Sequence, residues 1–264
     1  MTGQPFLDGV GARTKVLLAL ALLLVSPACQ SGGGEIAGTP DPADLRVLFV
    51  GNSLTYQNDL PDIVEAIAET AGEGPTVEVR MVAFPNVSLE DHWNRGDALD
   101  AIDEGGWDVV VLQQGPSTLP ESRAHLVEWS GRFAERIRTV GGRPALYSVW
   151  PPRAQPNGFD LVRDSYAEAA EAVDGILMPA GEAWREAWEV DPDLPLYASD
   201  DFHPSVLGSV TAAYVIWQRL TGRSPVGLPP LIEGGASVRI DLGAERAGLL
   251  QDAAAEANAR FGRG

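Results

Sequence analysis

The sequence predicts an α/β protein in which a parallel sheet of about five strands is covered by helices on both faces. Short apolar runs alternate with segments of helical periodicity, and this alternation repeats about five times after residue 45. Strands joined through helices form right-handed crossover units, and such sheets are buried on both sides. No segment after residue 45 has the composition of a linker, so residues 45–264 are predicted to form one domain.

Five apolar segments have the length and pattern of strands. The run at 107–112 is continuously apolar, which is typical of a strand buried on both faces, while the run at 77–83 alternates. Strands are therefore expected at 45–50, 77–83, 107–112, 144–149 and 176–178.

Helical periodicity and capping residues mark the segments between these strands. Asn58 or Asp59 is the expected cap of the first helix, and Ser88 with Asp91 forms a capping pattern. Gly141 and Gly142 are expected to end the third helix. Helices are expected at 60–68, 88–93, 121–140, 159–173 and 205–220, with an Ala-rich helix at 242–261 whose expected role is to cover the sheet.

The N-terminus has the pattern of an export signal. Arg13 and Lys15 precede an apolar run at 16–25 that is too short to span a membrane, so residues 1–29 are predicted to be a signal peptide. Residues 30–44 are rich in Gly and Pro and are expected to form a flexible tether. The sequence thus predicts an extracytoplasmic protein.

The single cysteine of the chain favours one of two kinds of export signal. Cys29 lies where a bacterial lipoprotein signal places its lipidated cysteine, so we expect lipidation and membrane anchoring there. The alternative is a plain secretory signal and a secreted or periplasmic protein. Either way the domain at 45–264 contains no cysteine, so we expect neither a disulfide nor a thiolate metal site in it.

Charge and composition exclude several classes of function. The net charge of −18 argues against a nucleic-acid partner, because binding phosphates requires a basic surface. The three histidines are widely separated and predict no metal site, and no glycine-rich phosphate loop is present. We therefore expect no cofactor.

Polar residues at the ends of two predicted strands mark a candidate site. Ser53 follows the first strand, and Gln113 and Gln114 follow the third. In open parallel sheets, ligands bind at the carboxyl ends of the strands. His203 lies in a loop that leads into a helix, with Asp200 three residues before it.

Serine, histidine and aspartate together suggest nucleophilic catalysis. A serine needs an adjacent base, and an aspartate can hold the histidine so that Nε2 is free to accept a proton. The other two histidines, His92 and His125, show no such partner and are expected to be surface or packed residues. We therefore favour a set of three residues, with Ser53 as nucleophile, His203 as base and Asp200 as orienting acid.

These residues resemble the motifs of a known family. The segments Gly51-Asn-Ser-Leu54 and Asp200-Asp-Phe-His-Pro204 are similar to the first and last blocks of the SGNH (GDSL-type) hydrolases. The resemblance extends over about residues 45 to 222 and implies a three-layer α/β/α sandwich with a flavodoxin-like strand order. It also implies the same roles for Ser53, His203 and Asp200, with Asp201 as the less favoured acid.

The family's oxyanion hole has three donors, and two of its blocks differ here. In the second block, Asn86 stands nearest to the place of the usual glycine. In the third, Gln113-Gln-Gly-Pro-Ser117 resembles the Gln-Gly-x-Ser version of sialate-esterase-like and some carbohydrate-esterase branches. The resemblance implies donors from the Ser53 N–H, the Asn86 N–H and the side chain of Gln114, with Gln113 as second choice.

The expected function is that of an exported serine ester hydrolase that works through an acyl-enzyme. By the resemblance, short acyl groups such as acetyl on carbohydrate are the preferred substrates. The alternatives are a lipase, lysophospholipase or thioesterase with the same triad, and a non-catalytic envelope module that binds carbohydrate. Trp93, Trp150 and Tyr197 are candidates either for lining a pocket or for packing in the core.

Overall fold

The computed structural model describes residues 44–235 and 237–264. The predicted signal peptide at 1–29, Cys29 within it, and the tether up to residue 43 lie outside the described residues. In the part of the chain that the structure describes, no helix combines the length and the apolar character needed to cross a membrane.

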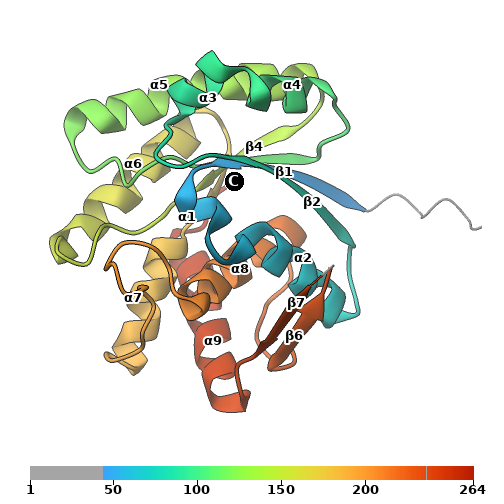
Figure 1. The fold of residues 1–264 in the computed structure, drawn as a ribbon, viewed down its shortest axis with the longest axis vertical. Helices are drawn as coiled ribbons and strands as arrows, with labels where there is room; N and C mark the ends of the chain where they lie inside the picture. Colours follow the sequence, from blue (N-terminus) through green and yellow to red (C-terminus); the bar gives the residue numbers. More distant parts are fainter. Residues whose placement is uncertain (1–43, 236) are drawn as a thin grey trace, which may run out of the picture. The chain divides into compact units, whose positions relative to one another are not determined.

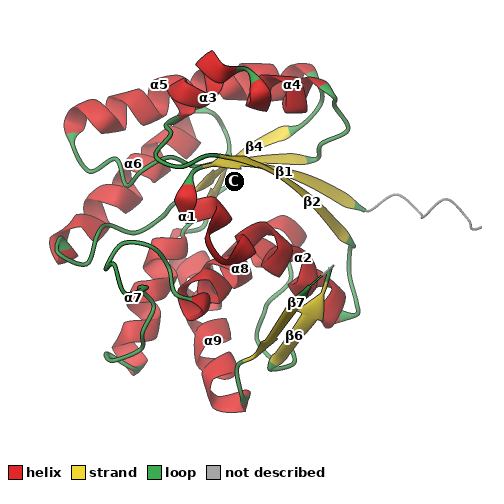
Figure 2. Ribbon diagram, viewed as in Figure 1, coloured by secondary structure: helices red, strands yellow, loops and turns green. Residues whose placement is uncertain are grey.

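A parallel sheet of five strands forms the centre of the domain, in the order β2-β1-β3-β4-β5 (Figures 1 and 2). This is the flavodoxin-like order that the resemblance to the SGNH hydrolases implied. Phe49 of β1 pairs with Met81 of β2 on one side and with Val111 of β3 on the other. The strands are β1 (Leu45–Gly51), β2 (Val77–Ala83), β3 (Val109–Leu112), β4 (Arg143–Tyr147) and β5 (Ile176–Met178).

Helices cover both faces of this sheet, so the predicted α/β/α fold class is confirmed (Figure 2). Helices α3 (Leu89–Arg95), α4 (Asp97–Asp103), α5 (Pro120–Thr139) and α6 (Phe159–Ala172) lie on one face. Helices α2 (Leu60–Ala71) and α8 (Val206–Thr221) cover the other, with α7 (Ala180–Val190) and α9 (Ala244–Phe261) packed beside α8.

Several elements differ from the sequence predictions. Helix α4 and the hairpin β6–β7 (Leu231–Gly234 and Val238–Asp241) were not predicted because their segments are short. Helix α7 was not predicted either, although Ala183, Trp184 and Ala187 recur at helical spacing. Helix α9 packs mainly against α7 and α8, so its expected role of covering the sheet was wrong. The C-terminal segment reaches the sheet at its edge, where Leu177 N–H donates to Arg263 O at 2.8 Å.

The capping predictions had mixed outcomes. Ser88 and Asp91 form the expected capping box at the start of α3. Asp59 occupies the N-cap position of α2, but its side chain makes no capping hydrogen bond. Asn58 has a φ of 57° and directs its side chain to a distant loop, so the prediction of a side-chain cap was wrong.

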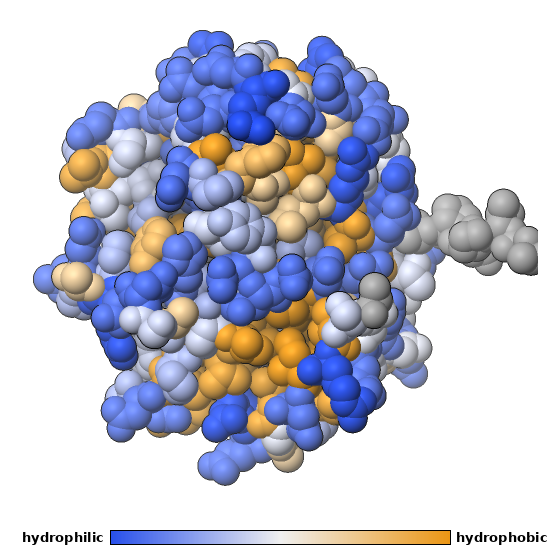
Figure 3. Space-filling model, in the orientation of Figure 1, coloured by the Kyte–Doolittle hydropathy of each residue, from blue (hydrophilic) through white to orange (hydrophobic). Residues whose placement is uncertain are grey.

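Aromatic side chains fill the core between the sheet and α7. Trp150 and Trp184 are fully buried and stack with their ring centroids 3.7 Å apart. The face in Figure 3 is largely hydrophilic around its rim, with apolar residues gathered toward the middle and below it.

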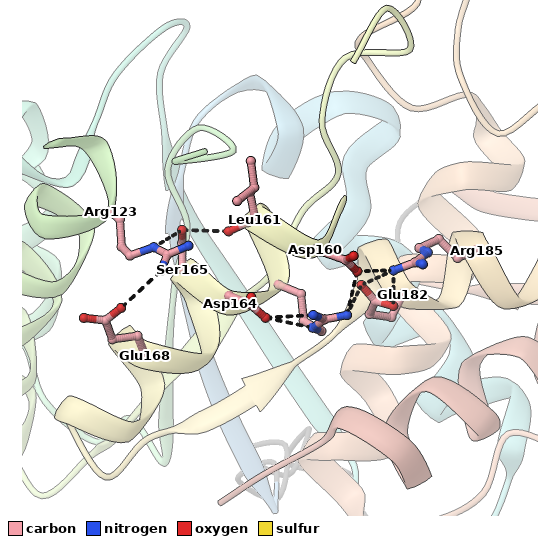
Figure 4. A network of polar contacts seen from close by, with 9 residues as sticks. Arg123, Asp160, Leu161, Asp164, Ser165, Glu168, Glu182 and Arg185 are labelled. Atoms are coloured by element: carbon pink, nitrogen blue, oxygen red, sulfur yellow. Dashed lines mark hydrogen bonds and ion pairs between the residues drawn. The ribbon is translucent and has the colours of Figure 1, made fainter. Parts of the chain in front are cut away.

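A network of charged side chains joins α6 to its neighbours α5 and α7 (Figure 4). Asp160 accepts from Arg163 and from Arg185, each at 2.8 Å, and Arg185 also pairs with Glu182. Burial raises the pKa of the Glu182 carboxyl, and the two arginines oppose that effect. The network therefore ties α6 to α7 by ionic contacts on the side away from the sheet strands.

Candidate active site

A cavity of about 400 Å³ opens at the carboxyl ends of the strands. Four segments line it: the turn after β1, the loop between β2 and α3, the loop between β3 and α5, and the loop before α8. Ser53, Asn86 and Gln114 all lie on its wall, as does Phe202, the neighbour of His203. Residues far apart in the sequence thus meet at the edge where ligands bind in such sheets.

Ser53 lies in a tight turn between β1 and the short helix α1 (Ser53–Tyr56). Asn52 caps this helix, since its Oδ1 accepts from Leu54 N–H at 3.1 Å. As the first residue of the helix, Ser53 has an N–H without a carbonyl partner in the helix. Ser53 thus lines the cavity with an N–H that the helix leaves without a partner.

Gln113 supports this turn from below. Its Oε1 accepts from Asn52 N–H at 2.9 Å and from Thr55 Oγ1 at 2.7 Å, and its Nε2 donates to Asn52 Oδ1 at 3.0 Å. A Cβ on Gly51 would lie only 2.2 Å from Thr55 Oγ1, so the tight turn requires glycine there. Gln113 is fully buried and does not line the cavity.

Gln114 lines the cavity and is held on all sides. Its Nε2 donates to Ser117 Oγ at 3.1 Å, and its Oε1 accepts from Leu89 N–H at 3.2 Å. The hydroxyl of Tyr166 fixes its backbone, donating to Gln114 O at 2.7 Å and accepting from Gln114 N–H at 3.1 Å. An amide nitrogen has two protons, so Gln114 keeps one donor that its own protein partner does not use.

Asn86 lies in the turn between β2 and α3 with a φ of 57°, in the left-handed region. Asparagine tolerates this backbone conformation better than most residues, which accounts for its standing where glycine is usual. Within the described residues, the N–H of Asn86 donates to no protein acceptor. Asn52 Nδ2 donates to Val87 O at 3.1 Å and so joins this loop to the Ser53 turn.

His203 and Asp200 form a close pair. Nδ1 of His203 donates to Asp200 Oδ2 at 2.5 Å, which leaves Nε2 as the free ring nitrogen. The other carboxylate oxygen accepts from His203 N–H at 2.9 Å and from Phe202 N–H at 3.1 Å. These hydrogen bonds, that from the imidazole first, lower the pKa of Asp200 to about 2. The carboxylate is therefore ionised throughout the range in which enzymes work.

Asp201 is directed elsewhere. Its carboxylate pairs with Arg153 at 3.2 Å, and its backbone has a φ of 58°. Its carbonyl accepts from Arg153 N–H at 2.9 Å. The geometry therefore pairs the histidine with Asp200 and not with its neighbour.

The candidate pocket aromatics are packed in the core. Trp150 donates from Nε1 to Phe202 O at 3.0 Å, and Tyr197 donates from its hydroxyl to Pro151 O at 2.6 Å. Trp93 packs edge-on against Phe133. None of the three is among the described residues that line the cavity. Trp150 and Tyr197 instead support the loop that carries His203.

Asn58 connects the segment of Ser53 with the segment of His203. Its Nδ2 donates to Pro204 O at 3.0 Å and to Ser209 Oγ at 2.9 Å. Among residues 44–235 and 237–264, no hydrogen bond joins Ser53 to His203. Phe202, the neighbour of His203 in sequence, lines the Ser53 cavity, and Asn58 links the two segments; the pairing of Ser53 with His203 remains a prediction.

Two histidines have partners that their positions in the sequence did not reveal. His92 is fully buried and donates from Nε2 to Gly51 O at 2.8 Å, and burial lowers its pKa. His125 lines the cavity, with its Nε2 3.0 Å from Glu90 Oε2. Glu90 lies 35 residues away in sequence, on another helix, so no local pattern could indicate this contact.

Comparisons with known proteins were made by sequence and by structure. No family model matches the chain, and no curated protein matches it. A protein of Slackia heliotrinireducens assigned to the SGNH hydrolases is 28% identical, with a TM-score of 0.56 over 66% of this chain and 98% of that chain.

Two further structures share the fold at lower identity. A DUF4886 family protein from Bacteroides uniformis has a TM-score of 0.67 at 18% identity, covering 81% of this chain and 94% of its own. A catalytic mutant of an acetylxylan esterase from Geobacillus stearothermophilus has a TM-score of 0.51 at 15% identity, covering 67% of this chain and 94% of its own.

Proposed function

Because the chain belongs to the SGNH hydrolases, we propose that it is an exported serine ester hydrolase that removes short acyl groups, above all acetyl, from carbohydrate or similar alcohols. One observation carries the proposal: Ser53, Asn86 and Gln114 line a single cavity together with Phe202, which lies between Asp200 and His203 in the loop where these two residues pair. Nucleophile, oxyanion donors, base and orienting acid are the set of groups that acyl transfer requires.

In the proposed mechanism, Ser53 Oγ attacks the ester carbonyl while Nε2 of His203 takes its proton. Asp200 holds Nδ1 and stabilises the imidazolium that forms. The N–H groups of Ser53 and Asn86 and the amide of Gln114 donate to the oxyanion. His203 then protonates the departing alcohol, leaving an acyl group on Ser53. Water, deprotonated by the same imidazole, attacks this acyl-enzyme and releases the acid.

The lining of the cavity favours a small, polar substrate. At about 400 Å³ the cavity lies near the lower end of the usual range for ligand sites. Its walls are formed largely by Ser, Asn, Gln, Asp and His side chains, with Val87, Pro116 and Phe202 as the larger apolar members. A cavity of this size has little room for a long acyl chain, which argues against the lipase alternative.

Export and anchoring rest on the predicted signal peptide. If Cys29 is lipidated, the predicted tether at 30–44 connects the catalytic domain to a membrane. A non-catalytic carbohydrate-binding module remains the alternative from another class, since fold alone does not establish activity.

The test is hydrolysis of p-nitrophenyl acetate by wild type and by Ser53→Ala, together with labelling by a fluorophosphonate. We expect the substitution to lower kcat by about 10³-fold or more, because the attacking oxygen is removed. Mapping should place the label on Ser53. The surface variant Ser224→Ala should retain both turnover and labelling.

Equal turnover by wild type and Ser53→Ala would contradict the proposal, as would a label on another residue. Faster hydrolysis of p-nitrophenyl octanoate than of the acetate would favour the lipase alternative instead. Absence of turnover with all esters, combined with binding of oligosaccharides, would favour the non-catalytic module.

A further inference from the structure

We propose that His125 and Asp91 form a subsite that binds hydroxyl groups on the alcohol portion of the substrate. The inference rests on the proposed function and assigns part of its specificity to two named residues. Neither residue has a part in the acyl-transfer mechanism, yet both line the same cavity as Ser53. An acetyl group has no hydroxyl, so hydroxyl groups bound there must belong to the alcohol.

The two residues come from neighbouring helices, which the contact between His125 and Glu90 joins. Asp91 lies in the first turn of α3, and His125 lies in the second turn of α5. The loops that carry Asn86 and Gln114 lead directly into these same helices. The subsite is therefore continuous with the oxyanion donors, on the wall that extends away from the sheet.

The imidazole of His125 is held in place by its partner. Its Nε2 lies 3.0 Å from Glu90 Oε2, and because an ionised carboxylate only accepts, Nε2 carries the proton. In the neutral ring Nδ1 is then a hydrogen-bond acceptor, and no described residue donates to it. The ring also packs against Trp129, with centroids 6.0 Å apart. Its side chain is 29% exposed, so a ligand in the cavity can reach it.

One carboxylate oxygen of Asp91 accepts hydrogen bonds from the protein, and the other is free to accept from a ligand. Its Oδ2 accepts from Ser88 N–H at 2.8 Å and from Ser88 Oγ at 2.7 Å. These hydrogen bonds, that from the backbone first, lower the pKa of Asp91, so the carboxylate stays ionised. Within the described residues, no donor contacts Oδ1. Asp91 and His125 thus both offer acceptors, which suit the O–H donors of a polyol or sugar.

The charge of the cavity selects against anionic alcohols. Of the described residues that line it, Asp91 is the one with a fixed charge, and none is Arg or Lys. A leaving group with phosphate would meet this carboxylate with no cation to offset the repulsion. The subsite therefore fits a neutral, hydroxyl-rich alcohol and disfavours phospholipid and coenzyme A esters.

Two acetyl esters that differ only in the alcohol provide the test: 6-O-acetylglucose, which has free hydroxyls, and propyl acetate, which has none. The measured quantity is the ratio of kcat/KM for the sugar ester to kcat/KM for propyl acetate. We expect His125→Phe to lower this ratio about tenfold, the usual effect of losing one hydrogen bond to an uncharged group. His125→Gln should restore most of it, since its amide keeps an acceptor.

Glu135→Gln, on the exposed side of the same helix, is the matched control and should leave the ratio as in wild type. An unchanged ratio in His125→Phe would overturn the subsite, as would an equal fall for both esters, which would indicate a purely structural role. Loss of both activities in Ser53→Ala, with the ratio unaltered in His125→Phe, would uphold the proposed function while rejecting the subsite. A wild-type protein that hydrolyses neither ester would overturn both.

Discussion

At the scale of single residues, two adjacent glutamines have different positions in the site. Gln113 and Gln114 are the same chemical group one position apart, and successive residues of an extended segment point in opposite directions. Gln113 therefore points beneath the Ser53 turn, where its amide bonds to Asn52 and Thr55. Gln114 points into the cavity with one amide proton to spare.

This separation predicts different consequences for the two side chains. Gln114→Glu keeps the shape and the acceptor for Leu89 N–H but loses the donor, so we expect kcat on p-nitrophenyl acetate to fall about 10²- to 10³-fold. Its melting temperature should change little. Gln113→Ala should instead lower the free energy of unfolding by about 1–3 kcal/mol, because buried partners lose their hydrogen bonds.

Kinetics and thermal unfolding of both variants provide the measurement. A Gln114→Glu variant with the turnover of wild type would exclude this side chain from the oxyanion hole. If Gln113→Ala retained full stability, its hydrogen bonds beneath the turn would contribute little.

At the scale of elements, a link joins the turn after α1 (Gln57–Asp59) to the His203 loop and helps to set how the two halves of the site meet. The two segments are 146 residues apart in sequence, and Asn58 Nδ2 bonds the second at Pro204 O. Asn58 also reaches Ser209 in the first turn of α8. A small error in the relative position of nucleophile and base is costly in catalysis, so this link bears on rate as well as stability.

Asn58→Gly tests the link without adding backbone strain, because glycine adopts the observed φ of 57° readily. We expect kcat/KM for p-nitrophenyl acetate to fall about tenfold, since two hydrogen bonds that position the loop are lost. Ser209→Ala removes only one of the acceptors and should have a smaller effect. An Asn58→Gly variant as active as wild type would show that Trp150 and Tyr197 hold the loop without it.

At the scale of the whole molecule, the C-terminal helix completes the layer that contains α7 and α8. Helix α9 buries an alanine-rich face together with Leu250, which is fully buried. Asn258 Nδ2 donates to Val215 O at 3.2 Å, which fastens the helix to α8. Since α8 begins three residues after His203, the packing of α9 supports the site from a distance.

Leu250→Ala should therefore destabilise the entire domain. We expect the free energy of unfolding to fall by about 2–5 kcal/mol, the usual result of truncating a buried leucine. Asp252→Ala, at an exposed position of the same helix, should change it by less than about 0.5 kcal/mol. Denaturant titration measures both, and a loss confined to Asp252→Ala would contradict the assigned packing.

The sequence by itself determined the alternation of strands and helices along the chain, because strands buried on both faces need apolar runs whatever their neighbours are. The order of the strands in the sheet was implied only by the resemblance to the SGNH hydrolases. It also determined the Asp200–His203 contact, because three residues of loop bring a carboxylate to an imidazole locally. Helix α4 escaped prediction because it is short, whereas α7 has an apolar face at Ala183, Trp184 and Ala187 and could have been predicted from its spacing. A short helix such as α4 forms where neighbouring elements provide an apolar surface for it to pack against.

Only the tertiary structure decided which glutamine lines the cavity, and that Asn58 reaches the histidine loop instead of capping its own helix. The same holds for His125, whose partner Glu90 comes from another helix. These outcomes depend on which distant segments lie side by side, and a side chain takes the partner that packing brings within hydrogen-bonding distance. Local spacing carries no information about that choice.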